Sequence, residues 1–321
     1  MKNNNKYIRI IGIILFFYIL SRINLQELFL ALKNINLSYF FLAIILLPAS
    51  IIIGILKWKI LINSQSIKIS SNLINEIFLK GLFWGVVSPA RLGEFLKAKY
   101  LTEAVDISGG RAFYTILMDR IIDLLIIIAV GMVGIINLFL FNKIKIGWTI
   151  FVLLSILFLF TIYFLVRRED TKKIFKFSLK ILNFSSIRKK TDSFFDEFFN
   201  GMKELNSVLF SKLIGYGFLH YLVTVLIYYL LALSLGINIT FFHLFLIVAL
   251  VLIILLIPIT ILGLGTREAG YIFFFAIFNI TAATAVAFSS LILFVSIILS
   301  IPGMILFLKN NRIYKLNSGT Q

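Results

Sequence analysis

The feature that most restricts the fold is a set of apolar runs of 18 or more residues with almost no charge. Clear examples are Leu37–Leu56, Gly147–Val166 and Ala282–Leu308, and Phe113–Phe141 is a further long run with charges only near its start. A run of roughly 20 apolar residues is long enough for an α-helix to cross a bilayer. A transmembrane β-barrel would instead show alternating segments of about ten residues, which the sequence lacks. We therefore predict an all-α polytopic membrane protein with about six to eight transmembrane segments.

Composition supports this class and excludes others. The chain is 60% hydrophobic, whereas globular proteins are about 45–50% apolar. Its net charge is +17, but most Lys and Arg residues flank apolar segments, where they orient the protein and meet anionic lipid. We therefore expect no nucleic-acid partner. The absence of Cys excludes disulfides, thiolate catalysis and Cys-ligated metals.

One apolar segment is broken at Ser88–Glu94. Pro89 has no backbone N–H and disfavours helical geometry at the residue before it, so the helix should end there. An Arg, a Gly and a Glu follow at once. Non-helical backbone at membrane depth survives only where protein or a wet cavity surrounds it. The segment Leu73–Leu101 is therefore predicted to be a broken, re-entrant unit that carries a site.

A second break lies between Phe241–Leu262 and Ala269–Phe278, at the sequence Gly-Leu-Gly-Thr-Arg-Glu. It again combines a Gly with an Arg and a Glu. If Phe241–Phe278 is re-entrant from the outer side, the N-terminus, the Lys57–Lys68 linker, Arg167–Lys212 and the C-terminus all fall on the inner side of the membrane. Lys143 and Lys145 would then lie outside. Paired interrupted segments in two inverted halves indicate a transporter's binding site. We predict an inverted repeat whose two breaks share one cavity.

We treat residues 1–321 as one integral membrane domain. Its parts are a first half (1–166), a basic amphipathic linker (167–212), a second half (213–308) and a short tail (309–321). Both termini and the linker are expected in the cytoplasm, and the protein in the plasma membrane.

The linker is predicted to lie on the inner lipid surface through two amphipathic stripes, or else to dock a partner. The first stripe sets apolar side chains between Ile174 and Leu182 against lysines. The second contains Phe194, Phe195, Phe198, Phe199, Met202 and Leu205.

The two broken units carry the residues suited to binding a substrate. Their arginines are permanently charged, planar donors that fit a phosphate. A half-helix that begins near either glycine would add free N–H groups and a positive dipole end. The glutamates would neutralise the arginines in an empty site or exchange protons, unless all four charges are fixed ion pairs that hold the broken helices. The candidate substrate-binding residues are Arg91, Gly93, Glu94, Gly265, Arg267 and Glu268.

Other marked residues are assigned supporting or structural roles. Asp119 and Asp123 share a helix face with Arg120, and either pair with Lys97, Lys99 or Arg111 or serve transport. These three residues and Pro89 form the supporting set. His220 and His243 stand alone on apolar segments and are assigned to core or interface. Gly131 and Gly134 should let another helix approach closely. Lys57, Trp58 and Lys59 are interpreted as an interfacial anchor.

The sequence contains no motif for metal binding, for ATP hydrolysis through a P-loop, or for a Ser–His–acid nucleophile. We therefore expect no catalytic residue, no metal and no cofactor, and a protein that is not an enzyme.

Three motifs resemble one family. They are Ser-Pro-Ala-Arg-Leu-Gly-Glu at 88–94, Asp-Arg-Ile-Ile-Asp at 119–123, and Gly-Leu-Gly-Thr-Arg-Glu-Ala at 263–269. Together they resemble the lysylphosphatidylglycerol synthase transmembrane family, also described as flippase-like or UPF0104-type. Members read T-P-G-R-x-G-E, E/D-R-x-x-D and G-x-G-x-R-E-A in this order. Ala90 stands where Gly is usual.

The resemblance implies lipid or lipid-linked substrate translocation. In two-part members, this membrane region is thought to flip an aminoacylated phospholipid that a separate soluble domain makes. That domain is not found here, so lysyl transfer is not expected. The expected partners are membrane lipids, either an anionic phospholipid or a polyprenyl-phosphate-linked lipid.

Two alternatives stay open. One is a non-catalytic accessory that supports envelope-lipid or glycan synthesis by docking a glycosyltransferase on the linker. The other is a membrane-embedded transferase that uses Glu94, Asp119 or Asp123 as a base.

Overall fold

The structure, a computed structural model, describes residues 15–142, 147–167, 170–173, 188–257, 260 and 262–318. All regular structure in these ranges is helical. Five helices are long and apolar enough to cross a membrane, and a bent pair, Leu15–Arg22 with Leu25–Lys33, would make a sixth. The predicted class, an all-α polytopic membrane protein, is confirmed.

The helices begin and end where local chemistry favours it. Asn24, Asn36, Ser70, Asn206 and Thr240 each cap a helix by accepting a hydrogen bond from an N–H group of its first turn. The elements are α2 (Leu25–Lys33), α3 (Leu37–Ile45), α4 (Leu47–Ser64), α5 (Ser71–Val87), the 3₁₀ helix η1 (Pro89–Phe95), α6 (Leu96–Ala104), α7 (Gly109–Asn142), α8 (Gly147–Val166), α10 (Arg188–Lys203), α11 (Ser207–Ser234), α12 (Phe241–Leu255), α13 (Thr266–Ala276) and α14 (Ala282–Ser318).

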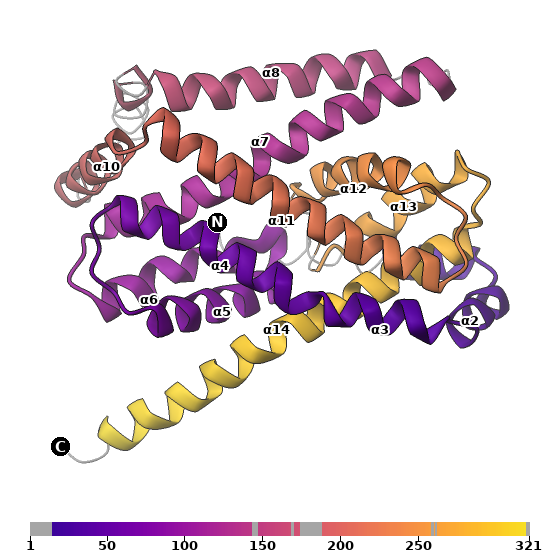
Figure 1. Ribbon diagram of the computed structural model, residues 1–321, viewed down its shortest axis with the longest axis horizontal. Helices are drawn as coiled ribbons and strands as arrows, with labels where there is room; N and C mark the ends of the chain where they lie inside the picture. The colour runs from indigo at the N-terminus through magenta and orange to yellow at the C-terminus, as the bar shows by residue number, and fades with distance from the viewer. Residues whose placement is uncertain are drawn as a thin grey trace.

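Each broken unit enters and leaves at one end of the molecule (Figure 1). The unit α5–η1–α6 starts shortly after α4 ends and finishes shortly before α7 begins. The unit α12–α13 lies in the same way between α11 and α14, at the opposite end. Long helices therefore flank each unit, as the sequence predicted. That the two halves are related as an inverted repeat stays a prediction.

Close backbone approach holds the broken units against the long helices. A Cβ at Gly303 of α14 would lie only 2.0 Å from the backbone oxygen of Leu79 in α5. A Cβ at Gly131 of α7 would lie 2.5 Å from Cδ1 of Ile253 in α12. Gly134 faces Leu250 of α12, so both α7 glycines serve the close packing expected of them.

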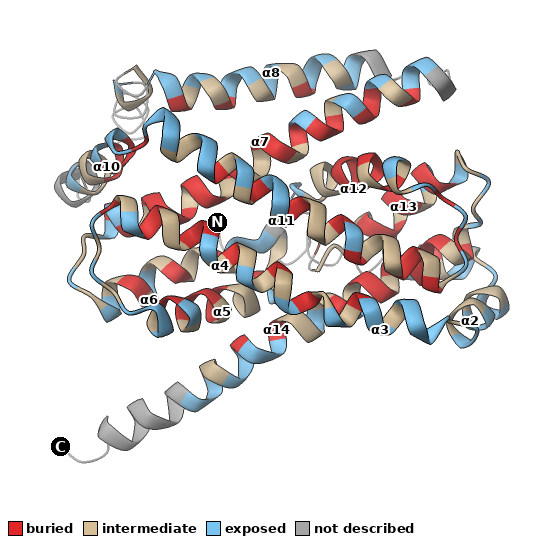
Figure 2. Ribbon diagram, in the orientation of Figure 1, coloured by how far each residue is buried: buried red, intermediate tan, exposed pale blue. Residues whose placement is uncertain are grey.

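Buried residues concentrate where the broken units meet the long helices, whereas α8 is mostly exposed (Figure 2). Its outer face carries Leu153, Leu159 and Phe160, each at least 60% exposed. Large apolar side chains exposed in this way suit a helix that contacts lipid, because exposure of the same surface to water would be strongly unfavourable.

The second stripe of the linker does not lie on lipid as predicted. Phe198, Phe199 and Met202 of α10 are buried. Phe198 packs 6.0 Å from Phe113 and 6.1 Å from Tyr114, measured between ring centroids, at the start of α7. These apolar side chains pack against α7, so the stripe is covered by protein. The first stripe lies largely outside the described residues.

Candidate functional site

The break of the first unit is a 3₁₀ turn locked by Ser88. The Ser88 hydroxyl accepts a hydrogen bond from the Gly93 N–H at 2.6 Å. A Cβ at Gly93 would lie 2.1 Å from the backbone oxygen of Trp84, so only Gly fits. The prediction of a half-helix that starts near Gly93 is wrong, because the next α-helix starts at Leu96. Pro89 opens the 3₁₀ turn instead, since it needs no N–H partner there.

Arg91 in this turn has a left-handed backbone, with φ of 58°, which is uncommon for a residue other than Gly. Its side chain is 52% exposed, and its Nε lies 2.8 Å from Oε1 of Glu94. Arg91 therefore combines a constrained backbone with a guanidinium that is only half covered.

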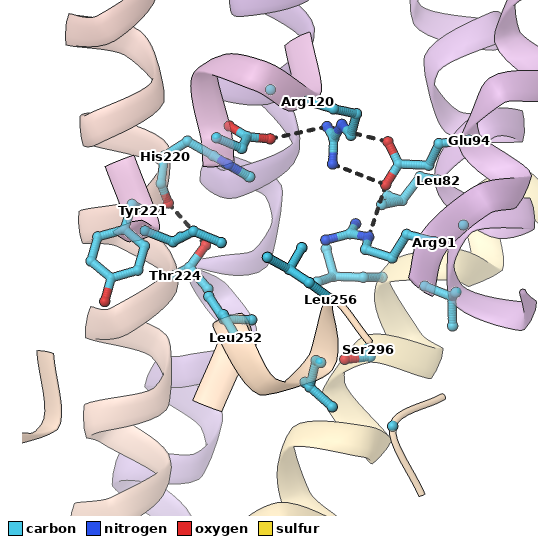
Figure 3. Close-up of a pocket in the computed structure, with 18 of the residues that line it drawn as sticks. Leu82, Arg91, Glu94, Arg120, His220, Tyr221, Thr224, Leu252, Leu256 and Ser296 are labelled. Carbon is cyan, nitrogen blue, oxygen red and sulfur yellow. Dashed lines mark hydrogen bonds and ion pairs between the residues drawn. The ribbon is translucent and has the colours of Figure 1, made fainter. Parts of the chain in front are cut away.

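Glu94 is the buried centre of a cluster of charges (Figure 3). Its carboxylate receives Arg120 on both oxygens, Nη1 to Oε1 at 3.3 Å and Nη2 to Oε2 at 3.2 Å. Lys97 Nζ lies 3.4 Å from Oε2. With Arg91, three cations therefore surround one carboxylate that is 3% exposed.

The helix α7 supplies the other carboxylates. Asp119 contacts Arg120 Nη2 at 2.7 Å, Lys57 Nζ at 3.0 Å and Lys97 Nζ at 3.5 Å. Asp123 pairs with Lys57 and lies 3.2 Å from Arg120. The expected pairing with Lys97 is present for Asp119, which is 1% exposed.

Lys99 and Arg111 do not join this cluster. Lys99 lies 3.7 Å from Glu103 on an exposed face, and Arg111 is exposed.

Lys57 is the residue that sequence reasoning placed wrongly. Lys57 is 1% exposed and Trp58 is fully buried, so they are not an interfacial anchor. The helix continues to Ser64 instead of ending at Leu56, which moves Lys57 from a helix end to its interior. The helical pattern continues without interruption past Lys57, and this continuation was the signal in the sequence that could have placed Lys57 inside the helix.

The second unit matches the prediction of a helix N-terminus at Gly265. This residue has φ of 83° and precedes the first residue of α13. Its N–H donates to Oε2 of Glu268 at 2.6 Å. Glu268 and Arg267 are buried, so the negative side chain at the helix start also meets the positive dipole end.

Arg267 and Glu268 form a closed network with Ser289 of α14. Arg267 Nε donates to Ser289 Oγ at 2.7 Å, and Arg267 Nη2 donates to Glu268 Oε1 at 3.1 Å. The Ser289 hydroxyl in turn donates to Glu268 Oε1 at 2.6 Å. This pair fits the structural alternative, in which fixed charges hold the broken helix in place.

One cavity of about 510 Å³ joins the two breaks. The first unit contributes Ser88, Arg91 and Glu94, and the second contributes Thr260, Gly263 and Arg267. Three of the predicted site residues do not line the cavity: Gly93, Gly265 and Glu268. Gly93 donates a hydrogen bond to Ser88, and Glu268 accepts one from Arg267. The expectation that the two breaks come together is met, with one of the two glutamates at the wall.

The remainder of the wall is mainly apolar (Figure 3). Leu252 and Leu256 of the second unit and Leu82 of the first lie around the charged end. His220 also lines the cavity, with Nε2 3.2 Å from the Ser50 hydroxyl.

His243 lies elsewhere, beside Thr240 at 2.8 Å and the Phe278 ring. Among the described residues, no group of three or more His, Cys, Asp and Glu side chains could hold a metal ion.

The fold and this cavity define a multi-pass α-helical membrane protein with a charged internal cavity between two broken helical units. The chain belongs to the family described as Lysylphosphatidylglycerol synthase TM region, which it matches over residues 8–303. It is 28% identical over 304 residues to the UPF0104 membrane protein MJ1595 of Methanocaldococcus jannaschii, with 90% of each chain covered. No solved structure matches the chain.

Proposed function

We propose that this protein binds an anionic lipid by its headgroup and moves it between the two leaflets of the plasma membrane. The observation that carries the proposal is that one cavity is lined by both Arg91 and Arg267, which come from opposite broken units. A site that is reached by units entering from opposite ends suits a substrate that passes from one side to the other.

The chemistry of the cavity fits a lipid. Arg91 offers a half-exposed guanidinium, which binds phosphate through charge-assisted hydrogen bonds. The leucine-rich wall suits the start of the acyl or prenyl chains, since ligand sites combine mostly apolar surface with a few placed polar groups. A phospholipid or a polyprenyl-phosphate-linked lipid would satisfy both requirements.

The two broken units have different roles in this proposal. The Arg267–Glu268–Ser289 network is closed on itself, so it fixes α13 against α14. Arg91, in contrast, has one carboxylate contact and open surface. We assign substrate contact to the first unit and support of the cavity wall to the second.

The orientation follows from charge. The end of α4, the helix α10 and the C-terminal end of α14 lie at the same end of the molecule (Figure 1). Basic residues at this end include Lys59, Lys68 and Lys203. By the positive-inside rule, this end would face the cytoplasm, together with both termini.

Leaflet transfer of fluorescent phospholipids in proteoliposomes tests the proposal. The purified protein should accelerate transfer, Arg91→Ala should reduce it, and the double variant Arg91→Ala, Arg267→Ala should abolish it. Arg111→Ala, outside the cavity, is the matched control. Full activity of the double variant would remove the assigned site.

Absence of transfer together with co-purification of a glycosyltransferase would favour the accessory role. The buried stripe of α10 leaves little apolar surface for such docking on that helix.

A further inference from the structure

The charges around the cavity do not balance. Among the described residues that line the cavity or pair directly with its lining, five are cations and four are carboxylates. The cations are Lys57, Arg91, Lys97, Arg120 and Arg267, and the carboxylates are Glu94, Asp119, Asp123 and Glu268. Charges inside a membrane are costly and normally pair, so one surplus positive charge requires an explanation.

The surplus charge can be located at Arg91. The side chains of Lys57, Lys97 and Arg267 are at most 6% exposed, and Arg120 is 26% exposed. Arg91 is 52% exposed, and within the described part of the chain its one ion pair is with Glu94 at 2.8 Å. If Arg91 is set aside, four cations face four carboxylates.

Glu94 does not depend on Arg91. Arg120 covers both of its oxygens and Lys97 lies beside the second. Because a carboxylate is satisfied by such a bidentate partner, Arg91 could leave Glu94 without stranding it. An incoming anion would then take the place of Glu94 on the guanidinium.

We infer that the cavity selects a lipid whose headgroup has a net charge of −1, as in a phosphodiester without a cationic group, and that Arg91 exchanges Glu94 for this phosphate. The inference rests on the proposed function and narrows its substrate. One added negative charge makes the cavity neutral. A phosphomonoester or diphosphate would bring a second charge with no free cation, which is unfavourable away from water.

Binding of three short-chain lipids to the full-length protein in detergent micelles tests the inference. The probes are dihexanoyl phosphatidylglycerol, with one charge, dihexanoyl phosphatidylcholine, with no net charge, and dihexanoyl phosphatidic acid. At about pH 8 the last carries close to two charges. Titration calorimetry should show phosphatidylglycerol binding at least about tenfold more tightly than the other two.

Charge variants give the sharper result. Arg91→Gln removes the surplus, so phosphatidylglycerol should lose its advantage over phosphatidylcholine. Asp123→Asn raises the surplus to two and should shift the preference to phosphatidic acid. Arg111→Gln should change nothing. Since Arg91 is half exposed, its variant should fold, which a thermal unfolding scan of each variant checks.

The outcomes separate this inference from the proposed function. Tighter binding of phosphatidic acid by the unmodified protein, or an unchanged preference in Arg91→Gln, would overturn the inference while leaflet transfer could still occur. If the unmodified protein neither transferred nor bound any of the lipids, both the inference and the proposed function would be overturned. The predicted order, reversed by Asp123→Asn, supports the inference.

Discussion

Arg120 of α7 and Glu94 of η1 meet through two parallel contacts of 3.3 and 3.2 Å, although 26 positions separate them in the chain. A paired arrangement of this kind fixes direction as well as distance. It fastens the broken segment of the first unit to a long helix, and it leaves Arg91, the most exposed of the three cations around Glu94, available to the cavity.

Loss of the Glu94 charge should destabilise the protein. Glu94→Gln leaves Lys97 with Asp119 and Arg120 with Asp119 and Asp123 as their remaining carboxylates, and the loss of hydrogen bonds to a buried charged group costs about 1.5–3 kcal/mol. Thermal unfolding of the purified protein in detergent should show a clearly lowered midpoint. Glu103→Gln is the control, because Glu103 is exposed and only faces Lys99 at 3.7 Å; its change should stay within about 0.5 kcal/mol. Equal midpoints for the two variants would contradict the cluster's role.

Gly93→Ala should disrupt the packing of η1 on α5. The new methyl group would approach a backbone oxygen of Trp84 to 2.1 Å, and such overpacking costs about 1–3 kcal/mol. Gly215→Ala provides a matched control, since nothing lies within 4 Å of its Cβ position in α11. That substitution should be neutral or stabilise by up to about 1 kcal/mol. Chemical unfolding in mixed micelles measures both, and a stable Gly93→Ala protein would refute the close approach.

Ser289→Ala should weaken the second unit. It removes the acceptor of Arg267 Nε and a donor to Glu268, and unsatisfied buried polar groups cost about 1–3 kcal/mol each. The neighbouring Ser290 bonds only the Val286 oxygen of its own helix, so Ser290→Ala should have little effect on the unfolding midpoint. If both serine variants behaved alike, the closed network would not hold α13.

Arg91→Gly should separate function from stability. Glycine relieves the left-handed backbone, worth roughly 1–2 kcal/mol, while a half-exposed ion pair contributes about 0–1 kcal/mol. The unfolding midpoint should therefore be unchanged or higher. Leaflet transfer in proteoliposomes should fall, because the phosphate loses its guanidinium. A lowered midpoint with normal transfer would show that Arg91 is structural.

Sequence patterns predicted much of the fold. Apolar runs located the long helices. In the structure, Pro48 lies in the first turn of α4, directly after the interruption at Leu46 that separates α3 from α4. The prediction was weaker where a helix ended: α4 runs eight residues past Leu56 to Ser64, and this extension carries Lys57 into the cluster. In a hydropathy profile, a lysine ends an apolar run. A buried carboxylate partner such as Asp119 allows the lysine to lie inside a membrane helix.

Local sequence patterns are enough to define the class of protein, the positions of the two breaks and the charged residues at each. These are local properties, because helix termination and membrane insertion depend on neighbouring residues. Which charges pair with one another follows from the tertiary structure. It closes Arg267 on Glu268 and Ser289 and leaves Arg91 half exposed. That distinction depends on burial and on partners distant in the chain, which spacing along a sequence does not encode.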